Sequence, residues 1–513
     1  MRPPESPGTA RRQSHSPSSA DSSFADDPAR RGNGPETPLP TLWSRPAGYG
    51  DVMTIAFPLI LSTGSWSVQH FIDRMFLCWY APEAMAAASM GGSAAFTILC
   101  FFSGTISYVN TFVAQYHGAG QRHRIGPVVW QGIYLSAAVG LLLPAFIPFS
   151  GPMFRLLGHS PELQPLEKTF FNITMAGVFF SLYNGVLSSF FTGRGRIWPT
   201  TWVTVGIVAV NLVLDYALIF GNCGMPRLGI AGAAWATVLA NVAGSLAFTI
   251  LVFSPANRRE YALGTGRRFD PGLMRRLLRF GAPCGLQFLM DMSSFTFFLL
   301  FVGGMGKVEG EATVLAFQVN TVAFMPMIGF HIAVSTLVGQ SLGRNQPDLA
   351  ARATWSAFHL TFAYMTTVAI LYVVAPSWFI YPFASKADPE KMKAIYPIAV
   401  NVLYFIAVYS VFDTMNLVFA GALKGAGDTL FVMVMSWGLS ITTVIVPILV
   451  ACVYFHGGLY TAWFFFSLYV IVLGFGFLFR FLQGKWRTMR VIEATPPALP
   501  PMLSEAPTAE LDA

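Results

Sequence analysis

Charged residues are scarce in this sequence: they make up 11% of the 513 residues, whereas apolar residues make up 54%. An average soluble protein is about 25% charged, so this composition excludes a soluble protein with an ordinary hydrated surface. The mean hydropathy of the whole chain is +0.54. A chain of this length and hydropathy is typical of a membrane protein that crosses the bilayer many times.

Cysteines and catalytic motifs are also few. The five cysteines are scattered and form no CxxC pair, so neither a disulfide framework nor a zinc site is predicted. The sequence lacks a P-loop with its lysine, so we expect no ATP-driven pump, and we predict no catalytic residue and no cofactor. The net charge of +7 arises from basic residues in short loops between apolar spans, so no nucleic-acid partner is expected.

Twelve apolar spans follow one another along the chain, and each meets the ~20 residues that a membrane-crossing helix needs. They lie at residues 52–80, 84–115, 126–154, 169–191, 199–220, 229–254, 278–304, 312–341, 354–382, 394–422, 429–453 and 459–480. Backbone groups in lipid must be hydrogen-bonded within their own segment. The sequence therefore predicts an all-α membrane protein with twelve transmembrane helices.

The predicted organisation has five parts. They are a disordered tail at 1–45, an N-lobe with helices 1–6 at 46–255, a basic linker at 256–277, a C-lobe with helices 7–12 at 278–485, and a disordered tail at 486–513. Basic residues are more frequent in the connections after even-numbered spans, which by the positive-inside rule predicts that both termini are cytoplasmic. We expect a monomer in the lipid bilayer of the plasma (inner) membrane.

The two lobes share sequence motifs in the same order. "VAQYHGAGQ" (113–121) ends the second span and "VGQSLGRNQ" (338–346) ends the eighth, which places Gln115 and Gln340 225 residues apart. "TGRGR" (192–196) after the fourth span matches "KGAGD" (424–428) after the tenth, at an offset of 232. Because six helices are an even number, both copies insert with the same orientation. The pattern predicts two parallel six-helix repeats, as in some transporters.

Ionisable residues well inside the spans are the candidate functional groups. They are Asp73 with Arg74 in span 1, Asp215 in span 5, Asp291 in span 7 and Asp413 in span 10. Acids that outnumber cations in a membrane interior either take up a proton or hold a cation. Both behaviours suit a coupling-ion site. Arg74 is the one intramembrane cation in the sequence, so a structural ion pair can account for at most one of the four acids.

Two polar residues extend the candidate site around Asp215. Asn211 precedes Asp215 by four residues and therefore shares its helix face. Thr237 in span 6 adds a hydroxyl among small residues that allow close helix packing. These oxygens suit Na⁺, and a carboxylate with neutral neighbours suits a proton equally well. A simpler interpretation is that Asn211 and Thr237 only form hydrogen bonds between helices.

The sequence resembles the multidrug and toxic compound extrusion (MATE) family over about residues 45–485. The resemblance is carried by "PLILSTGSWSVQHFID" in span 1, "NLVLDYALIFGNCGMPRLGIAGAAWAT" through spans 5 and 6, "GAPCGLQFLMD" in span 7, "FDTMNLVFAGALKGAGDT" at the end of span 10, and the two motifs that contain Gln115 and Gln340. It implies a twelve-helix exporter that exchanges cationic or amphipathic small molecules for Na⁺ or H⁺.

The family resemblance also assigns coupling residues. It implies an N-lobe cation or proton site at Asp73, Asn211, Asp215 and Thr237, with Na⁺ as the possible metal. The NorM-like branch, which this sequence resembles most, implies a second site in the C-lobe at Asp291 and Asp413.

Two features depart from the family pattern. The acid in the seventh helix is usually Glu, and Asp291 is one methylene shorter. Arg74 is not a family residue; because adjacent helical residues do not face each other, we expect it to point away from Asp73, toward the interface near Trp79 and Tyr80.

The sequence leaves three other functions open. A flippase for a lipid-linked sugar precursor belongs to the same broad superfamily, but a pyrophosphate group calls for a basic cavity rather than four acids and one arginine. An intramembrane hydrolase would use two aspartates, such as Asp291 and Asp413. A passive channel would need a filter loop, and the sequence has nothing similar. The choice between Na⁺ and H⁺ also stays open.

Overall fold

The computed structural model describes residues 41–156, 160–384 and 389–493, and the first half of this chain is built from helices only. Their bounds are α1 Tyr49–Tyr80, α2 Pro82–Ser107, α3 Val109–Gly118, α4 Arg122–Leu142, η2 Leu143–Phe149, α5 Ser150–Leu156, α6 Gln164–Thr192, α7 Trp198–Phe220, α8 Ile230–Val252 and α9 Pro255–Glu260. The spans predicted at 84–115 and 126–154 are each divided between consecutive helices.

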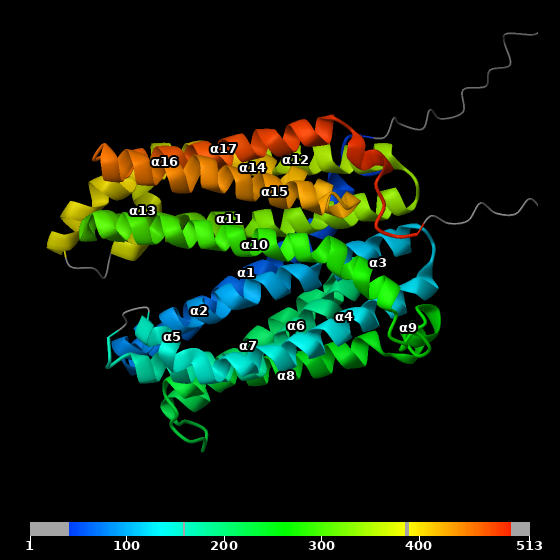
Figure 1. Cartoon of the computed structure of the whole chain (residues 1–513), viewed down its shortest axis with the longest axis horizontal. Coiled ribbons are helices and arrows are strands. Elements are labelled where there is room, and N and C mark those ends of the chain that lie inside the picture. Colours follow the sequence, from blue (N-terminus) through cyan, green and yellow to red (C-terminus); the bar gives the residue numbers. More distant parts are fainter. Residues whose placement is uncertain (1–40, 157–159, 385–388, 494–513) are drawn as a thin grey trace, which may run out of the picture. The chain divides into compact units, whose positions relative to one another are not determined.

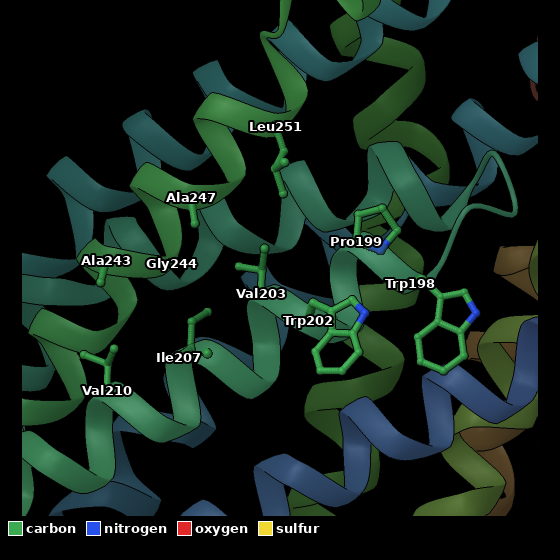
Figure 2. A pocket seen from close by; sticks show the side chains of 11 residues that line it. Trp198, Pro199, Trp202, Val203, Ile207, Val210, Ala243, Gly244, Ala247 and Leu251 are labelled. Carbon is green, nitrogen blue, oxygen red and sulfur yellow. The ribbon is translucent and has the colours of Figure 1, made fainter.

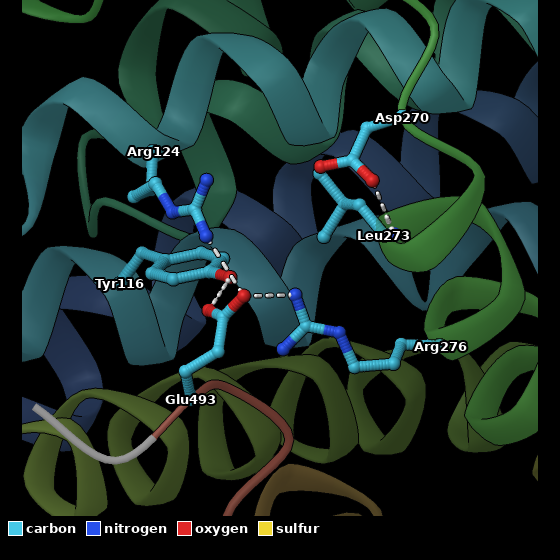
Figure 3. Close-up of polar contacts among 6 residues, drawn as sticks. All are labelled: Tyr116, Arg124, Asp270, Leu273, Arg276 and Glu493. Atoms are coloured by element: carbon cyan, nitrogen blue, oxygen red, sulfur yellow. Dashed lines mark hydrogen bonds and ion pairs between the residues drawn. The ribbon is translucent and has the colours of Figure 1, made fainter.

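The second half follows the same plan. Its helices are α10 Pro271–Met305, α11 Lys307–Gly343, α12 Pro347–Val374, α13 Pro376–Ala384, α14 Pro389–Ala426, α15 Thr429–Leu439, η3 Ser440–Ile445, α16 Val446–Ile448, η4 Leu449–Tyr454, α17 Leu459–Leu482 and η5 Lys485–Thr488. Proline at the first turn begins several of these helices, because its missing N–H would have no helical partner there. At α10 the Asp270 carboxylate also accepts a hydrogen bond from the Leu273 N–H, at 3.0 Å (Figure 3).

Eleven helical spans in the described residues are long and apolar enough to cross a membrane. The remaining long helix, α1, has 32 residues. Its centre, "STGSWSVQH" (62–70), consists largely of small or polar residues, so α1 lacks a sufficiently apolar stretch and is not among the eleven. The predicted fold class, an all-α protein of two six-helix repeats, is confirmed.

Helix packing repeats between the halves. In the first half α1 packs on α7, α2 on α6, and α6 on α8; in the second half α10 packs on α15, α11 on α14, and α14 on α17. The halves meet where α1 packs on α11 and where α2 packs on α10 (Figure 1). These two contacts are equivalent, because α1 corresponds to α10 and α2 corresponds to α11.

Each half also completes the apolar core of the other. Val52 and Ile55 at the start of α1 belong to the core formed mainly by α11, α14 and α17. Leu273 and Leu277 at the start of α10 belong to the core formed by α3, α4 and α6. This reciprocal exchange stabilises the contact between the halves through burial of apolar surface.

The predicted linker and C-terminal tail are more structured than expected. Helix α10 begins at Pro271, inside the predicted linker 256–277, and α9 lies in the same segment. Trp486, at the start of the predicted tail 486–513, is buried and stacks on Phe481 at 4.8 Å between ring centroids. Nothing in the sequence indicates this, because Trp486 stands between charged residues and belongs to no apolar run. Residues 1–40 and 494–513 of the predicted tails lie outside the described residues.

The two halves are joined by buried hydrogen bonds at the end of the helices where α3 and α9 lie, here called the α9 end. The Gln115 amide donates to the Gly425 carbonyl at 3.0 Å, and the Gln340 amide donates to the Gly193 carbonyl at 2.8 Å. Tyr108 adds a third contact of this kind, since its hydroxyl donates to the Lys424 carbonyl at 2.9 Å. The shared motifs of the sequence therefore lie at the contact between the halves.

Residues 489–493, here called the C-terminal segment, also lie at the α9 end. Glu493 accepts hydrogen bonds from the Tyr116 hydroxyl at 2.8 Å, from Arg124 at 2.8 Å and from Arg276 at 2.5 Å (Figure 3). The Val491 N–H donates to the Gln115 side-chain oxygen at 2.9 Å. The C-terminal segment therefore holds residues of both halves together.

Candidate functional site

Two of the predicted coupling residues face each other between α1 and α7. Asp215 is fully buried and Asp73 half-buried, and their carboxyl groups lie within hydrogen-bonding reach of each other. Neither oxygen of Asp215 has a donor among the described residues. Two ionised carboxylates cannot bond to each other, because both only accept. The pair therefore needs one shared proton or a bound cation.

Asn211 lies one helical turn before Asp215 on α7 and is also buried. Neither its side-chain oxygen nor its nitrogen has a hydrogen-bond partner among the described residues. A buried amide without partners costs roughly 1–3 kcal/mol. Amide and carboxylate oxygens are the kind of ligand that hard cations prefer.

Thr237, the fourth predicted residue, lies on α8, which packs against α7. It is half-buried, and its hydroxyl donates to the Ala233 carbonyl of its own helix at 3.1 Å. Among the described residues no hydrogen bond joins Thr237 to Asp73 or Asp215. The hydroxyl oxygen keeps a lone pair, so it remains able to accept.

A polar cluster next to this site does not emerge from the sequence reasoning. The Asn184 amide on α6 donates to the Asn241 carbonyl of α8 at 3.0 Å, and the Ser245 hydroxyl donates to the Asn184 side-chain oxygen at 2.8 Å. Asn241 and Ser245 are four residues apart, a spacing that puts both on one helix face. This spacing is the feature of the sequence that could have indicated the cluster. The cluster joins α6 to α8.

The acids of the second half have a different environment. Asp291 on α10 accepts a hydrogen bond from the Gln287 amide at 3.2 Å and also bonds to the Tyr469 hydroxyl of α17. Asp413 on α14 accepts from the Asn416 amide at 3.0 Å. Each carboxylate therefore has its own donors within the protein.

The two acids of the second half also feel each other's charge, because Asp413 lies close enough to Asp291 to act on it electrostatically. The structure thus brings the predicted residues together as two separate pairs, one in each half. Asp73 faces Asp215 directly, whereas Asp291 and Asp413 are each held by neighbouring amides.

Arg74 is exposed and forms no ion pair with Asp73 within the described part of the chain. Arg74 nevertheless lies close enough to Asp73 to act on it electrostatically, and its orientation toward the interface stays a prediction. The histidines near the sites have packing partners: His331 bonds to the Leu417 carbonyl at 2.8 Å, and His70 packs on Trp66 at 4.6 Å.

Sites for multivalent metals and for serine hydrolysis are not supported. Across residues 41–156, 160–384 and 389–493, no group of three or more His, Cys, Asp or Glu side chains converges as a metal centre. Gly339–Gly343 reads GxSxG, but it lies inside α11 and lacks the strand-to-helix turn that exposes a serine nucleophile.

The fold and its acidic pairs define a membrane transporter made of two repeated halves. The sequence matches the family model MatE over residues 58–217 and 283–450. The chain therefore belongs to the MatE family, and its members are transporters rather than enzymes. It is an integral membrane protein.

Curated relatives cover most of the chain. The multidrug resistance protein NorM of Burkholderia vietnamiensis is 27% identical over 398 residues, which are 77% of this chain and 86% of the relative. A probable NorM of Thermotoga maritima is 27% identical over 430 residues, covering 82% and 89%. The multidrug resistance protein PmpM of Pseudomonas aeruginosa is 27% identical over 416 residues, covering 80% and 86%.

Solved structures support the fold. A MATE transporter in complex with MaL6 has a TM-score of 0.77 at 18% identity, covering 85% of this chain and 96% of that one. The eukaryotic MATE transporter AtDTX14 has a TM-score of 0.76 at 18% identity, covering 85% and 96%. A MOP superfamily transporter from Pyrococcus furiosus has a TM-score of 0.76 at 18% identity, covering 85% and 95%.

Proposed function

We propose that this protein is a multidrug efflux antiporter that exports cationic or amphipathic compounds in exchange for inward H⁺ or Na⁺. The observation that carries the coupling proposal is the facing pair of Asp73 and Asp215. Such a pair changes its charge when one proton or one cation binds, so it can respond to an ion gradient. The multidrug resistance proteins among the relatives support the export of small molecules.

The proposed location is the plasma (inner) membrane, with the α9 end and both termini in the cytoplasm. The loops at the α9 end carry many arginines, among them Arg122, Arg196, Arg258 and Arg344. By the positive-inside rule, short loops rich in arginine stay on the cytoplasmic side. With the halves in contact at the α9 end, this structure corresponds to a state closed toward the cytoplasm.

The two acidic pairs serve different roles in the proposed cycle. Asp291 and Asp413 have amide donors of their own, and we propose that these acids attract a cationic substrate. Asp73 and Asp215 have no such donors and take the coupling ion, with the oxygen of Asn211 as an additional ligand. Alternating access then exchanges contacts between the two halves around these sites.

The alternative functions are less well supported by the site. A pyrophosphate carrier would need cations in the membrane interior, whereas both sites are acidic. The hydrolase considered from the sequence would use Asp291 and Asp413 as a free pair, and these acids are instead bonded to Gln287, Tyr469 and Asn416. We propose that the transporter acts as a monomer, because each half completes the core of the other within one chain.

Proteoliposomes with an imposed Na⁺ gradient or pH gradient, applied separately, test the proposal. Ethidium transport should follow one of the two gradients, and Asp73→Asn or Asp215→Asn should abolish it. Asp348→Asn is the matched control, because that aspartate is exposed and pairs with Arg487 far from the site. Normal ethidium transport by the double variant of Asp73 and Asp215 would exclude the coupling role.

A further inference from the structure

Two apolar grooves lie on the outer faces of equivalent helices in the two halves. The first, of about 580 Å³, is formed by α7 and α8 (Figure 2). The second, of about 290 Å³, is formed by α15 and η3. Every residue that lines the second groove corresponds, at the offset of 232 found between the shared motifs, to a lining residue of the first. The first set is Pro199, Trp202, Val203, Gly206, Ile207 and Val210; the second is Phe431, Val434, Met435, Gly438, Leu439 and Thr442.

A glycine forms the floor of each groove. A Cβ atom added at Gly206 or at Gly438 would have no heavy atom within 4 Å, so the space above both is open. Gly206 and Asp215 are nine residues apart, about 180° around a helix with 3.6 residues per turn. The first groove therefore lies on the opposite side of α7 from the coupling site, where the helix faces the lipid.

The grooves differ at the end where their helices begin. In the second half, Asp428 pairs with Arg480 at 2.7 Å, and the Arg480 guanidinium lies 4.6 Å from the centre of the Phe431 ring. The protein thus supplies both the anion and the cation there. In the first half the residue that corresponds to Asp428 is Arg196, at the same offset of 232. Arg196 is exposed and forms no ion pair among the described residues.

Further positive charge and two tryptophans lie near this end of the first groove. Trp198 and Trp202 are exposed and stack at 6.3 Å between ring centroids, an arrangement typical of the membrane interface. Leu251 lines the groove near the end of α8, and α9, which follows, carries the exposed residues Arg258 and Arg259. Neither arginine forms an ion pair in the part of the chain that the structure describes.

We propose that the groove between α7 and α8 binds one anionic phospholipid. An acyl chain lies over Gly206 between Trp202 and Val210, and the headgroup phosphate binds Arg196 with support from the arginines of α9. The apolar walls explain the affinity for the chain, and the unpaired Arg196 explains the preference for negative charge. The equivalent groove of the second half lacks this preference, because Arg480 there is already bonded to Asp428.

Native mass spectrometry of delipidated protein in detergent tests this proposal with dioleoylphosphatidylglycerol and dioleoylphosphatidylcholine. An arginine near a headgroup favours an anionic lipid by about fivefold in affinity, so the wild type should bind the first phosphatidylglycerol about fivefold more tightly than phosphatidylcholine. Arg196→Gln should remove this preference. Gly206→Leu should fill the groove and weaken binding of both lipids at the tight site. Leucine favours a helix more than glycine does, so this variant should fold normally.

Gly438→Leu is the matched control, since it fills the equivalent groove and should leave the preference for phosphatidylglycerol unchanged. Soluble glycerol phosphate, which has the charge without the chains, should not displace the lipid. Equal affinity of the wild type for both lipids would overturn the proposal. So would unchanged binding by Gly206→Leu, an equal loss in Gly438→Leu, or displacement by glycerol phosphate.

Discussion

Gln115 and Gln340 occupy equivalent positions in the two halves, and each donates a buried hydrogen bond to the half in which it does not lie. Gln115 bonds to Gly425 and Gln340 to Gly193, at 3.0 and 2.8 Å. The acceptors are themselves equivalent, because they are the same glycine of the motifs at 192–196 and 424–428. Opening the α9 end must break both bonds, so the pair contributes to the free-energy difference between the closed and open states.

The first prediction concerns this pair of glutamines. Replacing Gln115 and Gln340 together by alanine leaves two buried carbonyls without donors, which costs about 1 kcal/mol or more for each. The closed-to-open ratio should therefore fall roughly 30-fold. Double electron–electron resonance between spin labels at Arg122→Cys and Arg344→Cys, in a background without the five native cysteines, should show longer distances.

Gln131→Ala is the control for this experiment. Gln131 lies on α4 and is also buried, but its amide donates at 3.2 Å to the carbonyl of Arg268, which precedes α10. It therefore takes no part in the hydrogen bonds that Gln115 and Gln340 form between the halves. An equal lengthening in Gln131→Ala would mean that the change reflects general loosening of the fold.

The second prediction concerns the close approach of backbones at the same contact. A Cβ added at Gly343 would press on the Gln115 carbonyl and the Ala119 nitrogen. Gly343→Ala should therefore shift the protein toward the open state in the same spin-label measurement. Gly185→Ala on α6 has open space around its Cβ and should be neutral, or stabilising by about 0.5–1 kcal/mol. A closed state that is unchanged in Gly343→Ala would contradict this account.

The sequence predicted the helices, the repeat and the acids, but only part of the site. Repeated motifs such as those around Gln115 and Gln340 reveal which residues are equivalent, while the bond from each to the opposite half depends on how the halves pack. Likewise Asp73 and Asp215 are 142 positions apart in the numbering, and only the packing of α1 on α7 makes them face each other. Trp486 was missed because a single buried indole produces no apolar run.

The third prediction concerns Glu493 and pH. Partial burial raises the pKa of Glu493, but hydrogen bonds from Arg276 and Tyr116 outweigh this and lower the pKa from 4.5 to about 2. A lowered pKa means that the ionised group stabilises the fold above pH 4.5, and that this stabilisation is lost as the pH falls toward about 2. Because the side chain is 43% exposed, water screens the ion pairs, and the effect should be about 1 kcal/mol or less.

Thermal unfolding of the wild type and of Glu493→Gln checks this prediction. The difference in Tm should be constant between pH 7 and pH 5 and should shrink below pH 4.5. Glu260→Gln is the control, because Glu260 pairs with Arg122 at 2.6 Å within the first half. Glu493→Gln should also lengthen the spin-label distance at the α9 end, since Glu493 joins both halves.

The fourth prediction separates the roles of the two acidic pairs. Asp291→Asn or Asp413→Asn should raise the KM for ethidium by removing a charge that attracts the cation, while export of a neutral amphipathic dye should change little. Each substitution removes one negative charge. If export of ethidium and export of the neutral dye fall equally, these acids take part in ion coupling instead. Gln287→Ala should weaken ethidium export less than Asp291→Asn, because the carboxylate keeps its bond to Tyr469.

The fifth prediction concerns the charge state of the facing pair. In Asp73→Asn the new amide can donate to the Asp215 carboxylate, as the shared proton would. The variant should therefore behave as if the coupling ion were permanently bound. The spin-label distances of the wild type should change with pH or with Na⁺, whichever drives transport, and those of Asp73→Asn should not. A variant whose distances still follow the coupling ion would show that Asp73 is not part of the site that senses it.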